Sequence, residues 1–141
     1  MYAEVLPDRA ALAVDHLKLF NQWQMLMAKL YVLGDRFDVP RLKQASRKLQ
    51  ASNLLSRWNT DPPYFEAIKF AYQNLPGDDI LLKLYTDVYA KNYGYTDAQE
   101  ARLNAERLPH DFLVSVMMRY SRLFGLDRSR LSVKDYAGTE A

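Results

Sequence analysis

The sequence contains no cysteine, only two histidines and only five glycines in 141 residues. Without cysteine there are no disulfide bonds, no thiolate catalysis and no cysteine-ligated zinc sites. The glycines are scattered and form neither a G-x-x-x-x-G-K phosphate loop nor a G-x-S-x-G nucleophile motif. His16 and His110 lie far apart and show no metal-ligating spacing. We therefore expect no enzymatic activity, no metal and no cofactor.

Long apolar runs and a strong charge of one sign are also missing. No apolar stretch reaches membrane length, and Glu4, Asp8 and Arg9 argue against a signal peptide. The 19 basic and 17 acidic side chains give a net charge of +2, so no strong field attracts nucleic acid or membrane. The lack of cysteine fits a reducing compartment, so the sequence predicts an intracellular protein without a membrane partner.

Helical periodicity dominates what is present. One stripe has apolar residues at steps of three and four: Trp23, Leu26, Met27, Leu30, Leu33 and Phe37. Start signals for further helices are Pro40, Asp61-Pro62-Pro63, Asp78, Thr96 and Pro109. No alternating pattern favours strands. We predict an all-α fold, a single bundle of six or seven helices over residues 1–124, followed by a polar, flexible tail over 125–141.

One helix carries an uninterrupted basic surface. Residues 41–57 contain no acidic side chain but include Arg41, Lys43, Arg47 and Lys48. Such a surface suits contacts with phosphates, so nucleic-acid binding is one hypothesis. The alternative is a solvated face that keeps the bundle soluble, which the balanced overall charge and the lack of interleaved aromatic residues favour.

Tyrosine is abundant, with ten in the chain. Tyr85, Tyr89, Tyr93 and Tyr95 follow one another in and after a predicted helix. Tyrosine offers a rigid apolar ring with a polar tip, which protein interfaces favour, so these four are candidate partner-binding residues. The alternative is that they line the rim of the bundle.

One motif joins the first two predicted helices: Leu30-Tyr31-Val32-Leu33-Gly34-Asp35-Arg36-Phe37, followed by Asp38-Val39-Pro40 and Leu42-Lys43. This motif resembles one of fungal BTB/POZ-domain proteins. In that family a helix ending in "YVLADKY" precedes "VPxLK" and a second helix. A weaker resemblance continues through Phe65-Glu66-Ala67-Ile68, Tyr72-Gln73-Asn74-Leu75-Pro76 and Asp78-Asp79-Ile80-Leu81-Leu82, so that residues 26–90 are covered.

The resemblance implies a helical hairpin and the helices that follow it in a non-catalytic adaptor domain with protein partners. The residues before Leu26 are too few for the strands and early helices of a complete family core. The chain would then be a piece of a longer protein or a shortened relative. Within the hairpin we expect Leu30, Leu33 and Phe37 to bury the first helix, and Leu42 and Ala45 the second, around a corner set by Pro40. The oligomeric state stays open.

Overall fold

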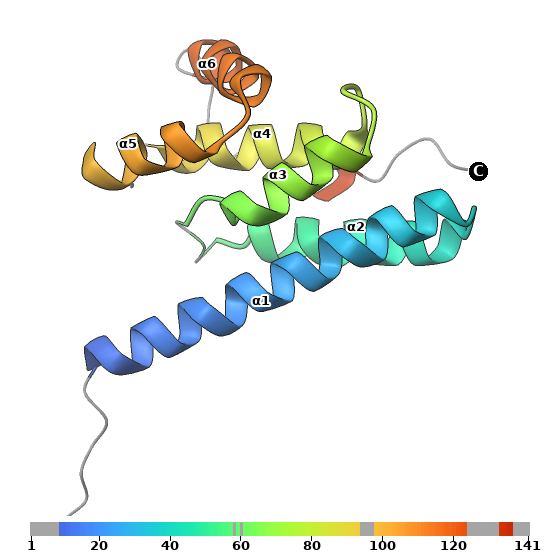
Figure 1. The fold of residues 1–141 in the computed structure, drawn as a ribbon, viewed down its shortest axis with the longest axis horizontal. Coiled ribbons are helices and arrows are strands. Elements are labelled where there is room, and N and C mark those ends of the chain that lie inside the picture. The colour runs from blue at the N-terminus through green and yellow to red at the C-terminus, as the bar shows by residue number, and fades with distance from the viewer. Residues whose placement is uncertain (1–8, 58, 60, 94–97, 124–132, 137–141) are drawn as a thin grey trace, which may run out of the picture.

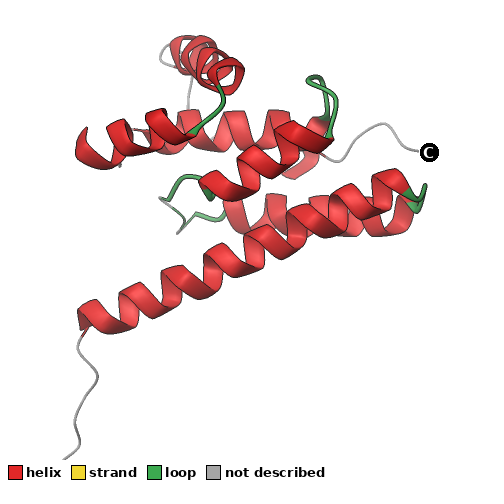
Figure 2. Ribbon diagram, viewed as in Figure 1, coloured by secondary structure: helices red, strands yellow, loops and turns green. Residues whose placement is uncertain are grey.

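A computed structural model describes residues 9–57, 59, 61–93, 98–123 and 133–136 (Figure 1). These residues form six α-helices and one short 3-10 helix: α1 (Arg9–Arg36), α2 (Pro40–Leu54), α3 (Phe65–Asn74), α4 (Ile80–Asn92), α5 (Ala98–Arg107), α6 (His110–Leu123) and η3 (Val133–Tyr136). Over the described ranges there is no strand (Figure 2). The prediction of an all-α bundle is confirmed.

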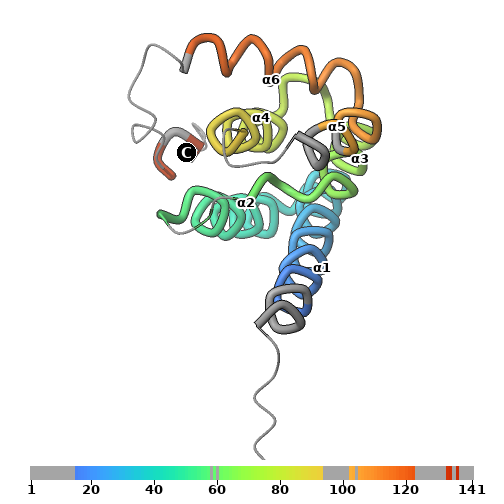
Figure 3. The backbone as a smooth tube through the Cα atoms, turned by 90° about the vertical axis from the view of Figure 1, so that its left-hand side faces the viewer, coloured from blue at the N-terminus to red at the C-terminus, as the bar shows by residue number. Residues whose placement is uncertain are grey.

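The helices stack in layers on an antiparallel hairpin of α1 and α2. α3 and α4 lie on one side of this hairpin, and α6 crosses over α4 on the far side of the molecule (Figures 1 and 3). α4 is the central helix, and ten of its residues are buried. The N-terminal half of α1 extends past the other helices (Figure 3). None of the described helices combines the length and the apolar character needed to cross a bilayer.

The corner between α1 and α2 is built locally. Asp38 adopts a left-handed backbone conformation with φ of 51°, and the Val39 N–H donates to the Gly34 carbonyl at 2.8 Å. Pro40 then occupies the first turn of α2, where its missing N–H costs no hydrogen bond. At the start of α4 the Asp79 carboxylate accepts the Leu81 N–H at 2.8 Å, so the capping residue is Asp79 and not Asp78.

The two hairpin helices approach each other closely. The Ser46 hydroxyl donates to the Met27 carbonyl at 2.6 Å. A Cβ atom added to Gly34 would lie 2.9 Å from the backbone nitrogen of Lys43. The small residue at position 34 is therefore what allows the backbones to come together.

The buried face of the hairpin differs from the predicted one. Leu33 and Phe37 are 45% and 71% exposed, and Ala45 is exposed too, whereas Tyr31 is fully buried. The residues that do bury α1 are Gln24, Met27, Ala28, Tyr31 and Val32, and those of α2 are Ser46, Arg47, Gln50, Ala51 and Leu54. Met27, Tyr31 and Gly34 recur at steps of four and three, so they share the face of α1 that packs, and Met27 is the member of the predicted stripe that lies on it. Leu30 and Leu42 are half-buried.

α1 runs without interruption from Arg9 to Arg36. One further expectation needs correction. Part of the predicted tail belongs to the core, because Tyr136 in η3 is 1% exposed and its hydroxyl donates to Asp87 Oδ2 at 2.7 Å. The prediction of a polar, flexible tail is therefore wrong for residues 133–136, and 125–132 and 137–141 lie outside the described residues.

Candidate functional site

The predicted basic surface is only partly present. Arg41 and Lys48 are exposed, two turns apart on α2. Lys43 is half-buried; its ammonium group forms an ion pair with Asp35 at 3.0 Å and lies 5.3 Å from the centre of the Tyr31 ring. Arg47 is 1% exposed, so its proposed role in contacting phosphates is wrong. The reason is that position 47 lies on the core face of α2, one turn before Ala51.

Arg47 instead belongs to a polar network inside the core. The charge of Arg47 acts on the Tyr31 hydroxyl, which donates to Asp79 Oδ1 at 2.7 Å. Burial and the adjacent Asp79 raise the pKa of Tyr31 above its ordinary value, with Arg47 acting in the opposite direction. Tyr31 therefore stays neutral and serves as a hydrogen-bond donor that ties α1 to the start of α4.

A second arm of this network joins α4 to the hairpin. The Tyr85 hydroxyl donates to Gln50 Oε1, and Gln50 Nε2 donates to the Ser46 hydroxyl at 3.2 Å. Tyr85 and Gln50 are fully buried, and burial raises the pKa of Tyr85. Because solvent and ligands cannot reach these groups, the network fixes the packing of α1, α2 and α4 rather than forming a reactive site.

The four candidate tyrosines do not form one surface patch. Tyr85 is fully buried, so it is not a surface contact as predicted, and Tyr89 is only 4% exposed. The physical reason is the central position of α4, which is covered by other helices over most of its length. Tyr93, at the end of α4, is 45% exposed. Tyr95 lies outside the described residues.

An open apolar groove lies where α4, α5 and α6 meet. It has a volume of about 460 Å³ and is lined by Tyr89, Tyr93, Ala105, Leu113, Val116, Met117 and Tyr120. We call it the tyrosine groove. The rings of Tyr93 and Tyr120 meet edge to face at 5.6 Å, and the ring of Tyr89 packs likewise against Phe112 at 5.5 Å. Met117, 72% exposed, stands at the mouth.

Part of this groove follows from the sequence pattern of α6. Leu113, Val116, Met117 and Tyr120 recur at helical spacing, so they lie on one face of that helix. In the structure α6 packs that face on α4 only in part, so the side chains furthest from the contact remain open to solvent. No signal in the sequence shows where along α4 the crossing of α6 lies.

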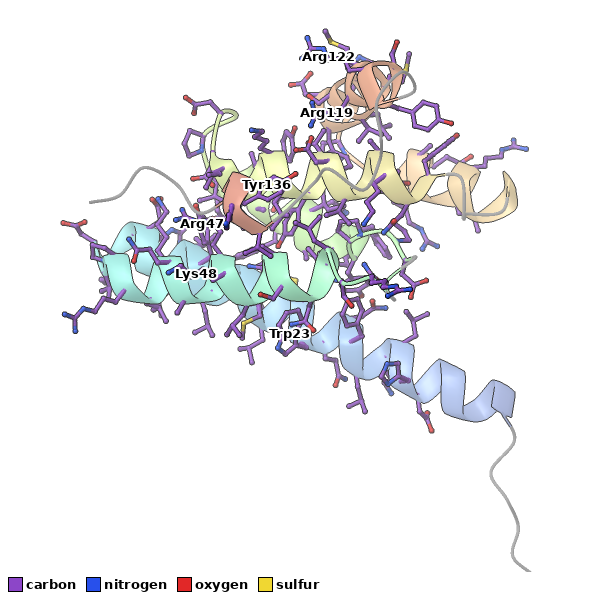
Figure 4. All side chains as sticks on the ribbon, turned by 180° about the vertical axis from the view of Figure 1, so that it is seen from behind. Trp23, Arg47, Lys48, Arg119, Arg122 and Tyr136 are labelled. Atoms are coloured by element: carbon purple, nitrogen blue, oxygen red, sulfur yellow. The ribbon has the colours of Figure 1, made fainter. Side chains whose placement is uncertain are left out.

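A second, polar cavity of about 390 Å³ lies beside the α3–α4 loop and α6. Its charged lining residues are Asp78, Asp79, Lys83, Asp87, Arg119 and Arg122. The Arg119 Nε and Asp87 Oδ1 atoms are 2.8 Å apart, and Asp87 Oδ2 also accepts from Tyr136. Figure 4 labels Arg119, Arg122 and Tyr136. The deepest charges of this cavity thus neutralise each other.

The hydroxyl groups of the polar cavity are also engaged within the protein. Thr86 Oγ1 donates to the Leu82 carbonyl at 2.8 Å, and Ser115 Oγ donates to the Asp111 carbonyl at 3.0 Å. Each of these protons is held by the preceding turn of its own helix. Among the described residues, no three His, Cys, Asp or Glu side chains come together in a way that would hold a metal ion.

Comparison of the chain with protein-family models, with curated proteins and with solved structures finds no match. Nothing in these comparisons links the chain to BTB/POZ proteins, and that resemblance stays a prediction from the hairpin motif.

Proposed function

We propose that the chain is a non-catalytic protein-interaction domain whose tyrosine groove receives the apolar face of an amphipathic helix from a partner protein. The observation that carries the proposal is the groove itself, which is open, apolar and lined by residues of three helices. A groove of this kind accepts a helix whose anchors recur every three or four residues.

The chemistry of the lining supports this proposal. Tyrosine rings present a large contact area at a small cost in side-chain entropy, and they are enriched at protein interfaces. Methionine adapts its shape to different apolar partners, and Met117 projects into solvent at the mouth.

The polar cavity supports an enzymatic role less well. Its buried carboxylate Asp87 is paired with Arg119, and the hydroxyl groups of Thr86 and Ser115 donate to backbone carbonyls. A hydrolase or transferase needs a nucleophile held next to a base. This arrangement supports a domain that binds rather than reacts.

The groove can be tested with peptides displayed on phage or yeast and selected for binding to the chain. Met117→Glu places a charge at the mouth of the groove, and we expect it to weaken the selected peptides on the order of 10-fold or more. Met118→Glu is the matched control, because Met118 is 56% exposed on the same helix but lines the polar cavity. Selected helical peptides that bind both variants as tightly as the wild type would refute the proposal.

Nucleic-acid binding remains a weaker alternative, because Arg41 and Lys48 are the exposed cations left from the predicted basic surface. Anisotropy measurements with random DNA and RNA at low salt would test it. Binding that weakens steeply with added salt and is lost in Arg41→Glu/Lys48→Glu would support this alternative. The BTB/POZ resemblance, which rests on residues 30–43 and more weakly on residues 65–82, would place the domain in an intracellular adaptor protein.

A further inference from the structure

α1 carries a row of apolar side chains that the core does not use. Their spacing alternates between four and three residues: Leu19, Trp23, Leu26, Leu30, Leu33 and Phe37. We call this row the α1 seam. Leu19 is 65% exposed, and Leu26 is 53% exposed. Trp23 and Leu30 are half-buried. An average spacing of 3.5 residues is the repeat with which one helix packs along another in a coiled coil.

The seam lies on the outer side of the hairpin. The core face of α1, which includes Ala28 and Tyr31, is a different one. Figure 4 shows Trp23 on the side of the hairpin away from Tyr136 and Arg119. α2 adds Leu49, which is 51% exposed, to the apolar surface of the hairpin. The surface is thus continuous over α1 and independent of the tyrosine groove.

We propose that the α1 seam binds the α1 seam of a second copy of this chain, with the two helices antiparallel. In this arrangement the projecting N-terminal half of each α1 lies along the hairpin half of the other. Each copy then covers the part of α1 that its own helices leave uncovered (Figure 3). The hairpins lie toward opposite ends of the pair, so the α2 helices do not compete for one place.

The charges beside the seam favour the antiparallel direction. Asp15, Gln22, Lys29 and Arg36 recur every seven residues along one edge, and all four are exposed. In an antiparallel pair this edge faces itself, so Asp15 meets Arg36 of the partner subunit and Gln22 meets the partner's Lys29. In a parallel pair the same edge faces Phe20, Met27 and Gly34, which offer no charge. Arg36 also donates to Asn74, and its guanidinium keeps further donors for an ion pair.

The apolar area is large enough for a weak to moderate dimer. The most exposed members are Leu19, Leu26, Leu33 and Phe37, at 45–71% exposure, and Leu49 extends the surface. Together they expose on the order of 500 Å² per chain, so that a symmetric pair buries about 1,000 Å², where specific interfaces begin.

The first test is the mass of the intact chain in solution by light scattering and sedimentation. We expect twice the 16.4 kDa monomer mass at high concentration, with dissociation on dilution. A chain that stays monomeric up to about 100 µM would overturn the proposal.

Variants then locate the interface. Leu26→Glu is expected to raise the dimer dissociation constant on the order of 30-fold or more, since it buries a charge in the seam. Val114→Glu is the matched control, because Val114 is 41% exposed on α6, and α6 lies on the side of the molecule away from α1 (Figure 1). Its dissociation constant should equal that of the wild type. Circular dichroism confirms that both variants are folded, and a dimer unaffected by Leu26→Glu would overturn the proposal.

Cysteine cross-linking tests whether the two α1 helices run antiparallel. Because the chain has no cysteine of its own, only the introduced cysteines can form a disulfide. In the antiparallel pair Leu19 lies opposite the partner's Leu30. A mixture of Leu19→Cys and Leu30→Cys chains should therefore form a mixed disulfide under mild oxidation. Leu33→Cys alone should form none, because its two copies would lie about 25 Å apart along the helices. A Leu33→Cys disulfide dimer would instead show a parallel pair and refute the proposed direction.

Discussion

Tyr85→Phe removes a single hydroxyl group from the centre of the polar network. Tyr85 is fully buried, and its hydroxyl donates to Gln50 Oε1, which is also fully buried. Phenylalanine fills the same space but leaves the Gln50 oxygen without this donor. An unsatisfied buried polar group costs about 1–3 kcal/mol, so we expect the free energy of unfolding to fall by about 2 kcal/mol.

A double-mutant cycle with Gln50→Leu isolates the contact. Gln50→Leu leaves the Tyr85 hydroxyl without its acceptor and also removes the donor to Ser46. In the double variant both the hydroxyl at position 85 and the amide at position 50 are gone, so neither stays buried without the other. The loss should therefore be smaller than the sum of the two single losses by about 1–2 kcal/mol. Urea unfolding followed by far-UV circular dichroism measures all four free energies, provided that the m-values agree.

The cycle has a clear opposing result and a control. Single losses that add to within about 0.3 kcal/mol would show that Tyr85 and Gln50 are not coupled, and the network assigned to the core would be wrong. Tyr93→Phe is the control, since Tyr93 is 45% exposed and its stability change should stay within about 0.5 kcal/mol.

Two further predictions concern packing and pH. Gly34→Ala should lower the urea midpoint, because the added Cβ would lie 2.9 Å from the Lys43 backbone nitrogen. The overpacking cost of about 1–3 kcal/mol outweighs the roughly 1 kcal/mol that alanine gains in helix propensity. Gly77→Ala is the control, because its added Cβ meets nothing within 4 Å and its urea midpoint should not fall. A raised midpoint in Gly34→Ala would contradict the close approach of α1 and α2. The pKa values of Tyr31 and Tyr85 are raised above the ordinary 10.0, so the unfolded chain loses these protons first as pH rises. The contribution of these two tyrosines to the free energy of unfolding should be fully present below pH 10.0. Above that pH it should fall by about 1.4 kcal/mol per pH unit for each tyrosine. Urea unfolding at alkaline pH should show a shallower fall in Tyr85→Phe, and an unchanged slope would contradict this assignment.

The helices could be predicted because their start signals are local. Pro40 opens α2, and a residue of the Asp78-Asp79 pair caps α4. Each signal acts through backbone groups within one turn, so it can be read without knowing the rest of the fold. The one-residue error at the start of α4 arose because both aspartates are able to cap a helix.

The faces of the helices could not be predicted in the same way. A stripe such as Leu26 and Leu33 shows that a helix has an apolar side, but not whether its own chain covers that side. Arg47 was expected on the surface because arginine is usually exposed. Its burial depends on Tyr31, 16 positions earlier, and on the position of α4 above both. The tyrosine groove likewise depends on where α6 crosses α4, which is a long-range property of the fold.

The contact between Tyr136 and Asp87 joins residues 49 positions apart. During synthesis, α4 emerges well before η3, so the Asp87 carboxylate must wait for its second partner until residue 136 has left the ribosome. This hydrogen bond can form only after both segments have been synthesised, and it ties η3 to the central helix α4 beside the Arg119–Asp87 ion pair.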